Sequence, residues 1–525
     1  MPDGAVATAF LAVIGAASLL AASARRFRST DRLPSLEGWA LADRSLGAGW
    51  IWLLLGGTVF TAYTFTAVPG LAYGNGALAF FAVPYTVIVC PMAFVLLPRL
   101  WSAIRAGGHI TVADYVRERY DSPGLALAVA LTGILATMPY LALQLLGIRA
   151  VLEAVGITDA SPLVADLAMV ALFAGLAIAT YRHGLRAPAV ISAFKGVAVF
   201  ASVFALVWLV LDVFGGPGGV FDAAAARLAA HDHPASHPLV LEADQQPAFA
   251  SLAVGSALAL LMYPHVLTVA FAASGPAALR KACVGLPAWT AVLALFGLLG
   301  IAAIAVGIRT APQGVESAVP LLVDRLMSAP LAGLVFGAIT VGALVPAAVM
   351  SVAAATSFVR NVYVEYVHPT ATPKRQVRIA KVVSLTAKLG AVAFVFGLRD
   401  QAAVNLQLLG GVWILQILPA VVVGLYTRLL HPRALLGGWA AGMAFGTVVV
   451  VREGFSPVVS FVPVGAGGQG PEVYAGLVAL LLNLVVAAAG TALLRRRGAP
   501  RGRGAGAPHH RPGAGPRPET GTSTP

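Results

Sequence analysis

Hydroxyl-bearing side chains are concentrated in one apolar stretch, residues 56–76, which reads GGTVFTAYTFTAVPGLAYGNG. A lipid-facing helix gains nothing from its five glycines, from Pro69 or from its hydroxyls. Backbone freed by Pro or Gly is tolerated at membrane depth only where protein or a water-filled cavity covers it. The pattern predicts a broken helix lined by a substrate or ion site; a Pro-kinked, closely packed helix is the alternative. The candidate substrate-binding hydroxyls are Thr58, Thr61, Tyr63 and Thr64.

A second apolar stretch, residues 247–273, has the sequence LLMYPHVLT in its middle. Its Pro264 corresponds to Pro69, which lies in the predicted span five spans earlier. Secondary transporters are often inverted repeats with broken helices at corresponding places in the two halves. Tyr263 and His265 flank this proline and are therefore candidates for contacts with a substrate or a proton. The two breaks are predicted to form one site.

Three basic residues, Arg149, Lys195 and Lys388, fall inside predicted membrane spans, where charged residues are costly and mark functional candidates. Lys195 lies eight residues into its span. Its side chain either extends to the cytoplasmic surface or replaces a bound ion and carries a proton. Lys388 is expected to pack against a carbonyl or to extend to the surface. Arg149 either attracts a carboxylate or anchors its helix at the interface.

Polar residues on two other predicted spans complete the candidate set for substrate binding. Gln144 lies five residues before Arg149 on the same span. Trp413 and Gln416 lie on a late span and are candidates to face the cavity, with aromatic packing as the alternative. These residues need several helices to bring them together, so the element pattern decides whether one site is feasible.

The composition identifies the elements as membrane helices. The chain has 525 residues, of which 58% are hydrophobic and 11% are charged, whereas a soluble domain has about 25% charged residues. We predict an all-α polytopic membrane protein with about 13 transmembrane helices, arranged as a five-plus-five inverted repeat with two broken helices. The predicted spans lie near 4–24, 47–72, 77–98, 124–152, 162–180, 187–214, 247–273, 284–308, 330–359, 378–398, 402–427, 434–451 and 472–494.

Basic residues predict the orientation. Most of the 35 Lys and Arg residues fall in one set of alternate loops and in the C-terminal tail. The opposite loops hold only Arg227, Arg309, Arg325, Arg399 and Arg452. By the positive-inside rule, the N-terminus is outside and the C-terminus is cytoplasmic, in a bacterial-type plasma membrane. The net charge of +13 is therefore a topology signal, and no nucleic-acid partner is predicted.

Four regions are predicted along the chain. Residues 1–35 form an extra N-terminal span and a cytoplasmic loop, and residues 36–430 form the transporter core, with repeats at about 47–214 and 247–427. Residues 431–494 add two C-terminal spans, and 495–525 form a disordered, basic cytoplasmic tail. The external loop 215–246 contains HDHPASH; metal binding there is the alternative to a solvated loop, since no ligand spacing repeats.

Several segments of the chain resemble the sodium–solute symporter family. They are ALADRSLGAGW (40–50), AVPGLAYGNG (67–76), GLRAPAV (184–190), RNVYVEY (360–366) and LLGGVWILQILPAVVVGLY (408–426). The similarity extends from residue 36 to about residue 450. Within the family, the GLRAP and ALVPAAVMS segments are most similar to the monocarboxylate permeases of bacteria.

The resemblance implies a sodium ion held by carbonyls at the first break and by a hydroxyl pair on the eighth core helix. Aligned on VPG, the carbonyls belong to Gly57 and Phe60, with Tyr63 admitted by a shift of one turn. The hydroxyl pair does not carry over, because the aligned residues are Val345 and Pro346 or, in a second alignment, Ser351 and Val352. We retain Ser351 as a candidate for cation coupling.

The fifth core helix also departs from the family pattern. Where the family often has Thr-Asp and then Gln, this chain has Ile191-Ser192 and then Lys195. Sodium requires hard oxygen ligands, as Ca²⁺ does, and each change removes one. Lys195 adds a cation at the same place, so the coupling ion is predicted to be H⁺ or Na⁺.

We predict a secondary active symporter that imports a small organic anion with a cation by alternating access. The resemblance implies a monocarboxylate such as pyruvate, lactate, acetate or propionate; sodium-coupled uptake of a sugar, proline or similar solute is the alternative. No GxxxxGK[ST] loop and no nucleophile–base arrangement is present, so we predict no enzyme activity and no cofactor. A channel built on the same helices is the rival class. It would need rings of identical residues contributed by the subunits of an oligomer, and no part of the sequence repeats in that way. A sensor would need an appended cytoplasmic signalling domain, and the tail is too short and too polar to form one. The predicted partners are a small-molecule substrate and the lipid bilayer, and the sequence predicts no oligomeric state.

Overall fold

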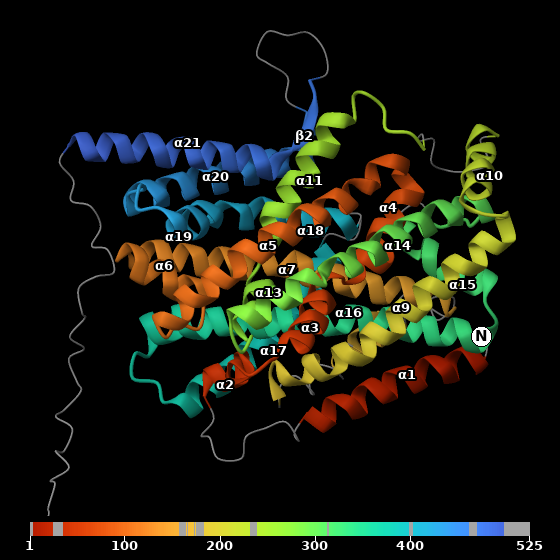
Figure 1. The fold of residues 1–525 in the computed structure, drawn as a ribbon, viewed down its shortest axis with the longest axis horizontal. Coiled ribbons are helices and arrows are strands. Elements are labelled where there is room, and N and C mark those ends of the chain that lie inside the picture. The colour runs from red at the N-terminus through yellow and green to blue at the C-terminus, as the bar shows by residue number, and fades with distance from the viewer. Residues whose placement is uncertain are drawn as a thin grey trace, which may run out of the picture.

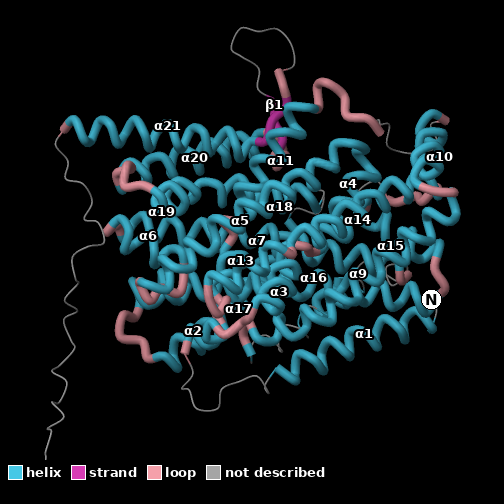
Figure 2. The backbone as a smooth tube through the Cα atoms, in the orientation of Figure 1, coloured by secondary structure: helices cyan, strands magenta, loops and turns pink. Residues whose placement is uncertain are grey.

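The computed structural model describes residues 4–24, 35–156, 164, 166–172, 174, 183–230, 239–311, 314–397, 403–460 and 470–497. Its long helices run side by side along the horizontal direction of Figure 1, and Figure 2 shows that nearly all of the described chain is helical. Apolar segments take this form because a helix satisfies every backbone donor and acceptor within itself in lipid. The prediction of an all-helical, polytopic membrane protein is confirmed.

The longer elements have the following bounds: α1 Gly4–Ser23, α3 Ala48–Val59, α4 Val68–Asn75, α5 Ala82–Ala106, α6 Val112–Tyr120, α7 Pro123–Ala154, α9 Arg186–Phe214, α10 Pro217–Ala229, α11 Gln246–Leu260, α12 Pro264–Phe271, α13 Pro276–Val284, α14 Leu286–Val306, α15 Ala318–Leu326, α16 Ala329–Phe358, α17 Pro373–Gly397, α18 Ala403–Ile414, α20 Pro432–Arg452 and α21 Ala475–Arg496. Within the described residues, nine helices are long and apolar enough to cross a membrane, or ten if the bent pair α11–α12 is one span. The count of thirteen therefore stays a prediction.

The first broken element leaves α-helical geometry earlier than Pro69. Helix α3 ends at Val59, where Phe60 takes φ −92° and ψ 99°, and a π-helical turn, η3 (Tyr63–Ala67), precedes α4. Pro69 instead lies in the first turn of α4, a position that needs no backbone N–H. The departure from α-helical geometry therefore begins within residues 58–66, ahead of the proline.

The second broken element does break at its proline. Helices α11 and α12 meet at 45°, with Leu261–Tyr263 between them, and Pro264 opens α12. Pro264 is well suited to this position because its fixed φ matches the first helical turn.

Helices α7, α9 and α16 surround the two breaks. Helix α16 packs against α7, α9, α12 and α17, and α3 packs against α9. The first helix, α1, lies along α16 and α9, and Figure 1 shows it at the edge of the bundle. The polar groups on the inner faces of α7, α9 and α16 are therefore held on long, buried helices.

At the end of the bundle where α6 lies, one carboxylate joins two elements. Asp114, in the first turn of α6, accepts hydrogen bonds from the Thr111 backbone N–H at 3.3 Å and from Asn361 Nδ2 at 2.7 Å. Arg360 Nε donates to the same carboxylate at 3.1 Å. Both partners lie in the π-helical segment η6 (Val359–Val367), which continues α16. The helix cap of α6 therefore also fixes the end of α16.

We expect Asp114→Ala to lower stability by about 2 kcal/mol. The change removes a helix cap, worth about 1 kcal/mol, and charge-assisted hydrogen bonds to Arg360 and Asn361. Glu118→Ala is the control, because this exposed acid of the same helix forms a surface pair with His109 and such pairs contribute little. Thermal unfolding in detergent should show a clearly larger loss for Asp114→Ala, and equal losses would contradict the assignment.

The C-terminal region consists of two packed helices and a short hairpin. Helices α20 and α21 pack along each other, and the strands β1 (Val458–Ser460) and β2 (Glu472–Tyr474) pair antiparallel between them in the sequence. Tyr474 is buried, and its hydroxyl donates to the Leu408 carbonyl of α18 at 2.7 Å. The hairpin therefore connects this region to the core.

Three sequence predictions concern residues outside the described ranges. They are most of the predicted span 162–180, the HDHPASH segment at 231–237 and the tail from residue 498.

Candidate functional site

The side chain of Lys195 lies in a cage of backbone oxygens. Its Nζ donates to the carbonyls of Gly57 at 2.6 Å, Phe60 at 2.8 Å and Gly342 at 2.9 Å. The residue is fully buried. An ammonium has three N–H donors, and this cage supplies three acceptors. The lysine thus connects the first break to α9 and α16.

Two of these carbonyls are available because α3 ends at the break. Phe60 leaves α-helical geometry, so Gly57 and Phe60 are the last residues before the chain turns. Their oxygens would otherwise accept helical hydrogen bonds, and near a helix end such carbonyls lack intrahelical partners. A lysine ammonium is one of the few groups that satisfies several of them at once.

An aromatic ring covers another side of the ammonium. The centroid of Phe65 lies 5.4 Å from Lys195 Nζ, within the range of a cation–π contact. The ring lies against Gly342, where an added Cβ would come within 2.5 Å of Phe65 Cε2. Only glycine at position 342 permits this contact without displacing the ring.

The structure excludes one of the two alternatives for Lys195, extension to the surface. The side chain does not extend to a surface, because it is fully buried and bonded to the break. The Tyr63 carbonyl is occupied by the backbone N–H of Val68, so the carbonyls brought to the lysine are those of Gly57 and Phe60.

Several side chains at the two breaks and on α7 carry unpartnered polar atoms. Among the described residues, the buried polar atoms without a hydrogen-bond partner include Tyr63 Oη, Thr64 Oγ1, Tyr140 Oη, and Nδ1 and Nε2 of His265. Tyr63 and Thr64 belong to the first break, Tyr140 to α7 and His265 to the second break. Buried polar groups are nearly always bonded in folded proteins, so a group of exceptions requires an explanation.

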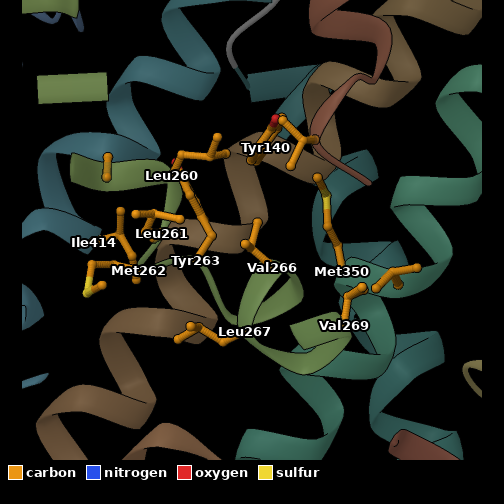
Figure 3. Packing of buried hydrophobic residues seen from close by; sticks show 14 of the residues in the cluster. Tyr140, Leu260, Leu261, Met262, Tyr263, Val266, Leu267, Val269, Met350 and Ile414 are labelled. Atoms are coloured by element: carbon orange, nitrogen blue, oxygen red, sulfur yellow. The ribbon is translucent and has the colours of Figure 1, made fainter. Parts of the chain in front are cut away.

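The rings of this group are in contact. The Tyr140 and His265 centroids are 5.3 Å apart, and the Tyr263 ring lies 5.2 Å from Tyr140 and 5.3 Å from His265. Figure 3 shows Tyr140 and Met350 in one cluster of buried side chains with residues of the second break and of α12. The structure therefore brings the second break to the middle of α7.

Gln144 holds the first break against α7. Its Oε1 accepts from the backbone N–H of Ala62 at 3.1 Å, and its Nε2 donates to Thr61 Oγ1 at 3.3 Å and to the Tyr140 carbonyl at 3.1 Å. Gly147, one turn later, permits the close approach, since a Cβ there would lie 2.4 Å from the Cβ of Ala62. Gln144 therefore positions the break, and its polar atoms are already occupied.

We expect Gln144→Leu to destabilise the protein by about 1–3 kcal/mol, because it leaves the buried N–H of Ala62 without an acceptor. The matched control is Gln376→Leu on α17, where a half-buried glutamine makes one hydrogen bond, to the Ala371 carbonyl. Thermal unfolding should show a larger loss for Gln144→Leu. A smaller loss than the control would show that Gln144 does not hold the break.

The other predicted substrate contacts are occupied by partners within the protein. Thr58 bonds the Leu55 carbonyl, Tyr263 the Gln407 carbonyl, Trp413 the Thr447 hydroxyl, and Gln416 the Val412 carbonyl and Asn483. Thr61 accepts from Gln144 and from the backbone N–H of Tyr63. These side chains are buried near the breaks, on α18 or, for Gln416, in the 3-10 turn η7 (Leu415–Ile417) that follows α18, but their polar atoms already have partners.

Sequence reasoning did not select Tyr140 or Gly342. Tyr140 lies one helical turn before Gln144, and this spacing places the two on one face of α7. Gly342 contributes a backbone atom, and its sequence signal is the proline four residues later.

Comparison with known proteins identifies the family. Residues 39–441 match the sequence profile of the sodium:solute symporter family, which covers most of the chain. The chain belongs to this family. It is 43% identical over 471 residues to a monocarboxylate transport permease protein of Rhizobium johnstonii, covering 90% of this chain and 93% of that protein. It is 30% identical over 433 residues to the uncharacterized symporter YodF of Bacillus subtilis, covering 81% and 84%.

The fold of this symporter is also found in a solved structure, that of a Na⁺-coupled sialic acid symporter in a substrate-bound, outward-open state. The two share a TM-score of 0.73 at 13% identity, over 94% of this chain and 98% of that one. The chain is thus a multi-pass membrane symporter rather than an enzyme, and it shares its fold with known transporters.

In this symporter, a second lysine is buried on the other side of α16. Lys388 donates to Ser351 Oγ at 2.8 Å and to Ser384 Oγ at 3.3 Å, and it is 4% exposed. It therefore packs inside the protein, mainly against hydroxyls. Ser351 follows Gly342 by nine residues, about 13 Å along the helix, and it does not join the Lys195 cage.

Proposed function

We propose that this symporter imports a small monocarboxylate together with a proton, with the N-terminus outside and the C-terminus in the cytoplasm. Pyruvate, lactate, acetate and propionate are the candidate substrates. The two repeats would rock around a site formed by the breaks at Thr58–Thr66 and Tyr263–Thr268, which is alternating access.

The unpartnered polar atoms support a small oxygen-rich substrate. A carboxylate has two oxygens that accept up to about four hydrogen bonds, and Tyr63, Thr64 and His265 have buried polar atoms without a hydrogen-bond partner among the described residues. Their burial also limits the size of the substrate, since the surrounding rings are in van der Waals contact.

The buried ammonium is the observation on which the proposal mainly rests. Lys195 is bonded only to neutral carbonyls, and the described residues place no carboxylate on it. An uncompensated charge in the membrane interior is costly. A substrate anion bound at the adjacent polar group would supply the opposite charge, whereas a sugar would not.

The same cage supports a proton as the coupling ion. The carbonyls that the family resemblance implies for sodium are those of Gly57 and Phe60, and both are bonded to Lys195. A sodium ion at this position would meet the ammonium and be repelled. The name of the 43% identical relative, a monocarboxylate transport permease, agrees with the proposed substrate class.

Uptake of labelled pyruvate into vesicles reconstituted with the purified protein tests the substrate class. We expect uptake that excess unlabelled lactate, acetate or propionate reduces by competition. Uptake of a labelled sugar or of proline that is insensitive to these acids would contradict the proposal.

A further inference from the structure

The third carbonyl of the lysine cage comes from the middle of a continuous helix. Gly342 lies well inside α16, where a carbonyl normally accepts the backbone N–H of the residue four positions later. In this chain that residue is Pro346, which has no N–H to donate. The Gly342 oxygen is therefore free of its helical partner, and Lys195 Nζ bonds it at 2.9 Å.

We infer that Pro346 is a positioning residue for the cation centre: by withholding a backbone donor, it presents the Gly342 oxygen to the Lys195 ammonium. The inference rests on the proposed function for the role of Lys195, but its geometry stands on the hydrogen bonds alone. Without this oxygen, the break would supply two acceptors for three N–H donors.

Other prolines within helices show that a freed carbonyl alone does not make such a site. Pro91 and Pro98 in α5 and Pro139 in α7 remove the same kind of donor. The carbonyls four residues before them belong to Val87, Phe94 and Leu135, and Lys195 bonds none of these three. At Pro346, the freed oxygen, the Gly342 position without a side chain and the Phe65 ring coincide around one ammonium.

The position also accounts for a departure from the family pattern. One alignment of this helix places Val345 and Pro346 where the resemblance implies two hydroxyls that hold a cation. The chain lacks those side-chain oxygens, but Pro346 makes the Gly342 backbone oxygen available to a cation. That cation is the ammonium of Lys195, a group of the protein itself.

A double-mutant cycle between positions 195 and 346 tests the inference. Pro346→Ala restores an N–H that competes for the Gly342 oxygen, and Lys195→Met removes the ammonium while keeping an unbranched chain. The four proteins are compared by thermal unfolding in detergent, without substrate or sodium. Coupling energies isolate the interaction between two sites when single changes do not introduce new ones.

We expect the change in Tm caused by Pro346→Ala to be about 2 °C more positive in the Lys195→Met background than in the wild type. In the methionine variant the restored helical bond costs nothing, whereas in the wild type it weakens a charge-assisted bond. Equal shifts in the two backgrounds would overturn the inference, because a proline that only bends the helix gives additive effects. If Lys195→Met does not fold, Lys195→Leu, which also has no N–H donor in its side chain, replaces it in the cycle.

Uptake provides a second readout in the wild-type background. We expect Pro346→Ala to reduce pyruvate uptake about tenfold, the effect of weakening one hydrogen bond to a charged group. Pro91→Ala is the control, because Pro91 is an exposed proline within α5. We expect this variant to change pyruvate uptake by less than about twofold. Equal uptake by the two variants would also overturn the inference. Absence of pyruvate uptake by the wild type would instead contradict the proposed function and leave the unfolding cycle as the test.

Discussion

Replacing Lys195 by glutamine is expected to reduce proton-driven uptake about 100-fold and to flatten its dependence on external pH. Glutamine has no charge and two N–H donors, so one of the three cage carbonyls loses its partner. A bound carboxylate would then lack a compensating charge in a low-dielectric site, where charge interactions are strong. Uptake of labelled pyruvate at several external pH values measures both effects.

Lys388→Gln is the matched control for this variant. Lys388 is also a buried lysine of a membrane helix, but its ammonium bonds the hydroxyls of Ser351 and Ser384, away from both breaks. We expect this variant to keep the pH dependence of the wild type. Wild-type uptake and pH dependence in Lys195→Gln, or the same loss in both variants, would contradict the role given to Lys195.

His265→Phe is expected to raise the KM for pyruvate about 100-fold without lowering thermal stability. Both imidazole nitrogens are buried without a partner among the described residues, so the free protein loses no hydrogen bond when they are removed. Replacing an unsatisfied polar group by an apolar one of similar shape is neutral or stabilising. A bound substrate would lose a donor, which appears in the KM.

The opposite pattern is expected for Tyr263→Phe. The Tyr263 hydroxyl donates to the Gln407 carbonyl at 3.0 Å, so its removal loses one buried hydrogen bond. Stability should fall by about 1 kcal/mol, while the KM for pyruvate should change less than about threefold. A large rise in KM for Tyr263→Phe with none for His265→Phe would show that the polar group at the breaks has been assigned wrongly.

The broken helices could be predicted from sequence because their residue types are costly elsewhere in a membrane. Gly56, Gly57 and the following hydroxyls mark the first break, and Pro264 marks the second. The first break was expected within residues 58–66, but the sequence does not specify the residue at which the helix ends, because glycines and hydroxyls extend over the whole stretch. Only the backbone angles of Phe60 show where the helix ends.

The candidate site was predictable to the extent that residue type determines role. A lysine inside a span requires partners, and the resemblance pointed to the carbonyls of Gly57 and Phe60. Trp413 and Gln416 have their polar atoms bonded to Thr447 and Asn483, because the rotation of α18 and of the turn η7 after it sets their direction. Sequence spacing does not specify that rotation when a helix is apolar on all sides.

Contributions from backbone atoms were the hardest to foresee. Any residue carries a carbonyl, so nothing in the type of residue 342 marks it as a ligand. Its availability follows from Pro346, and its partner follows from the packing of α9 against α16. Such contacts depend on the fold more than on the local sequence.

The central claim is that a covalently attached ammonium takes the place of a bound sodium ion. Uptake of labelled pyruvate in reconstituted vesicles, with sodium and proton gradients imposed separately, tests it most directly. We expect an inward proton gradient to drive accumulation without sodium. Membrane potential should have a weak effect, because a monoanion and one proton move no net charge and cannot use the roughly 2.3 kcal/mol per 100 mV available to a moving charge. Accumulation that requires a sodium gradient at fixed pH, and that a proton gradient does not drive, would contradict the claim.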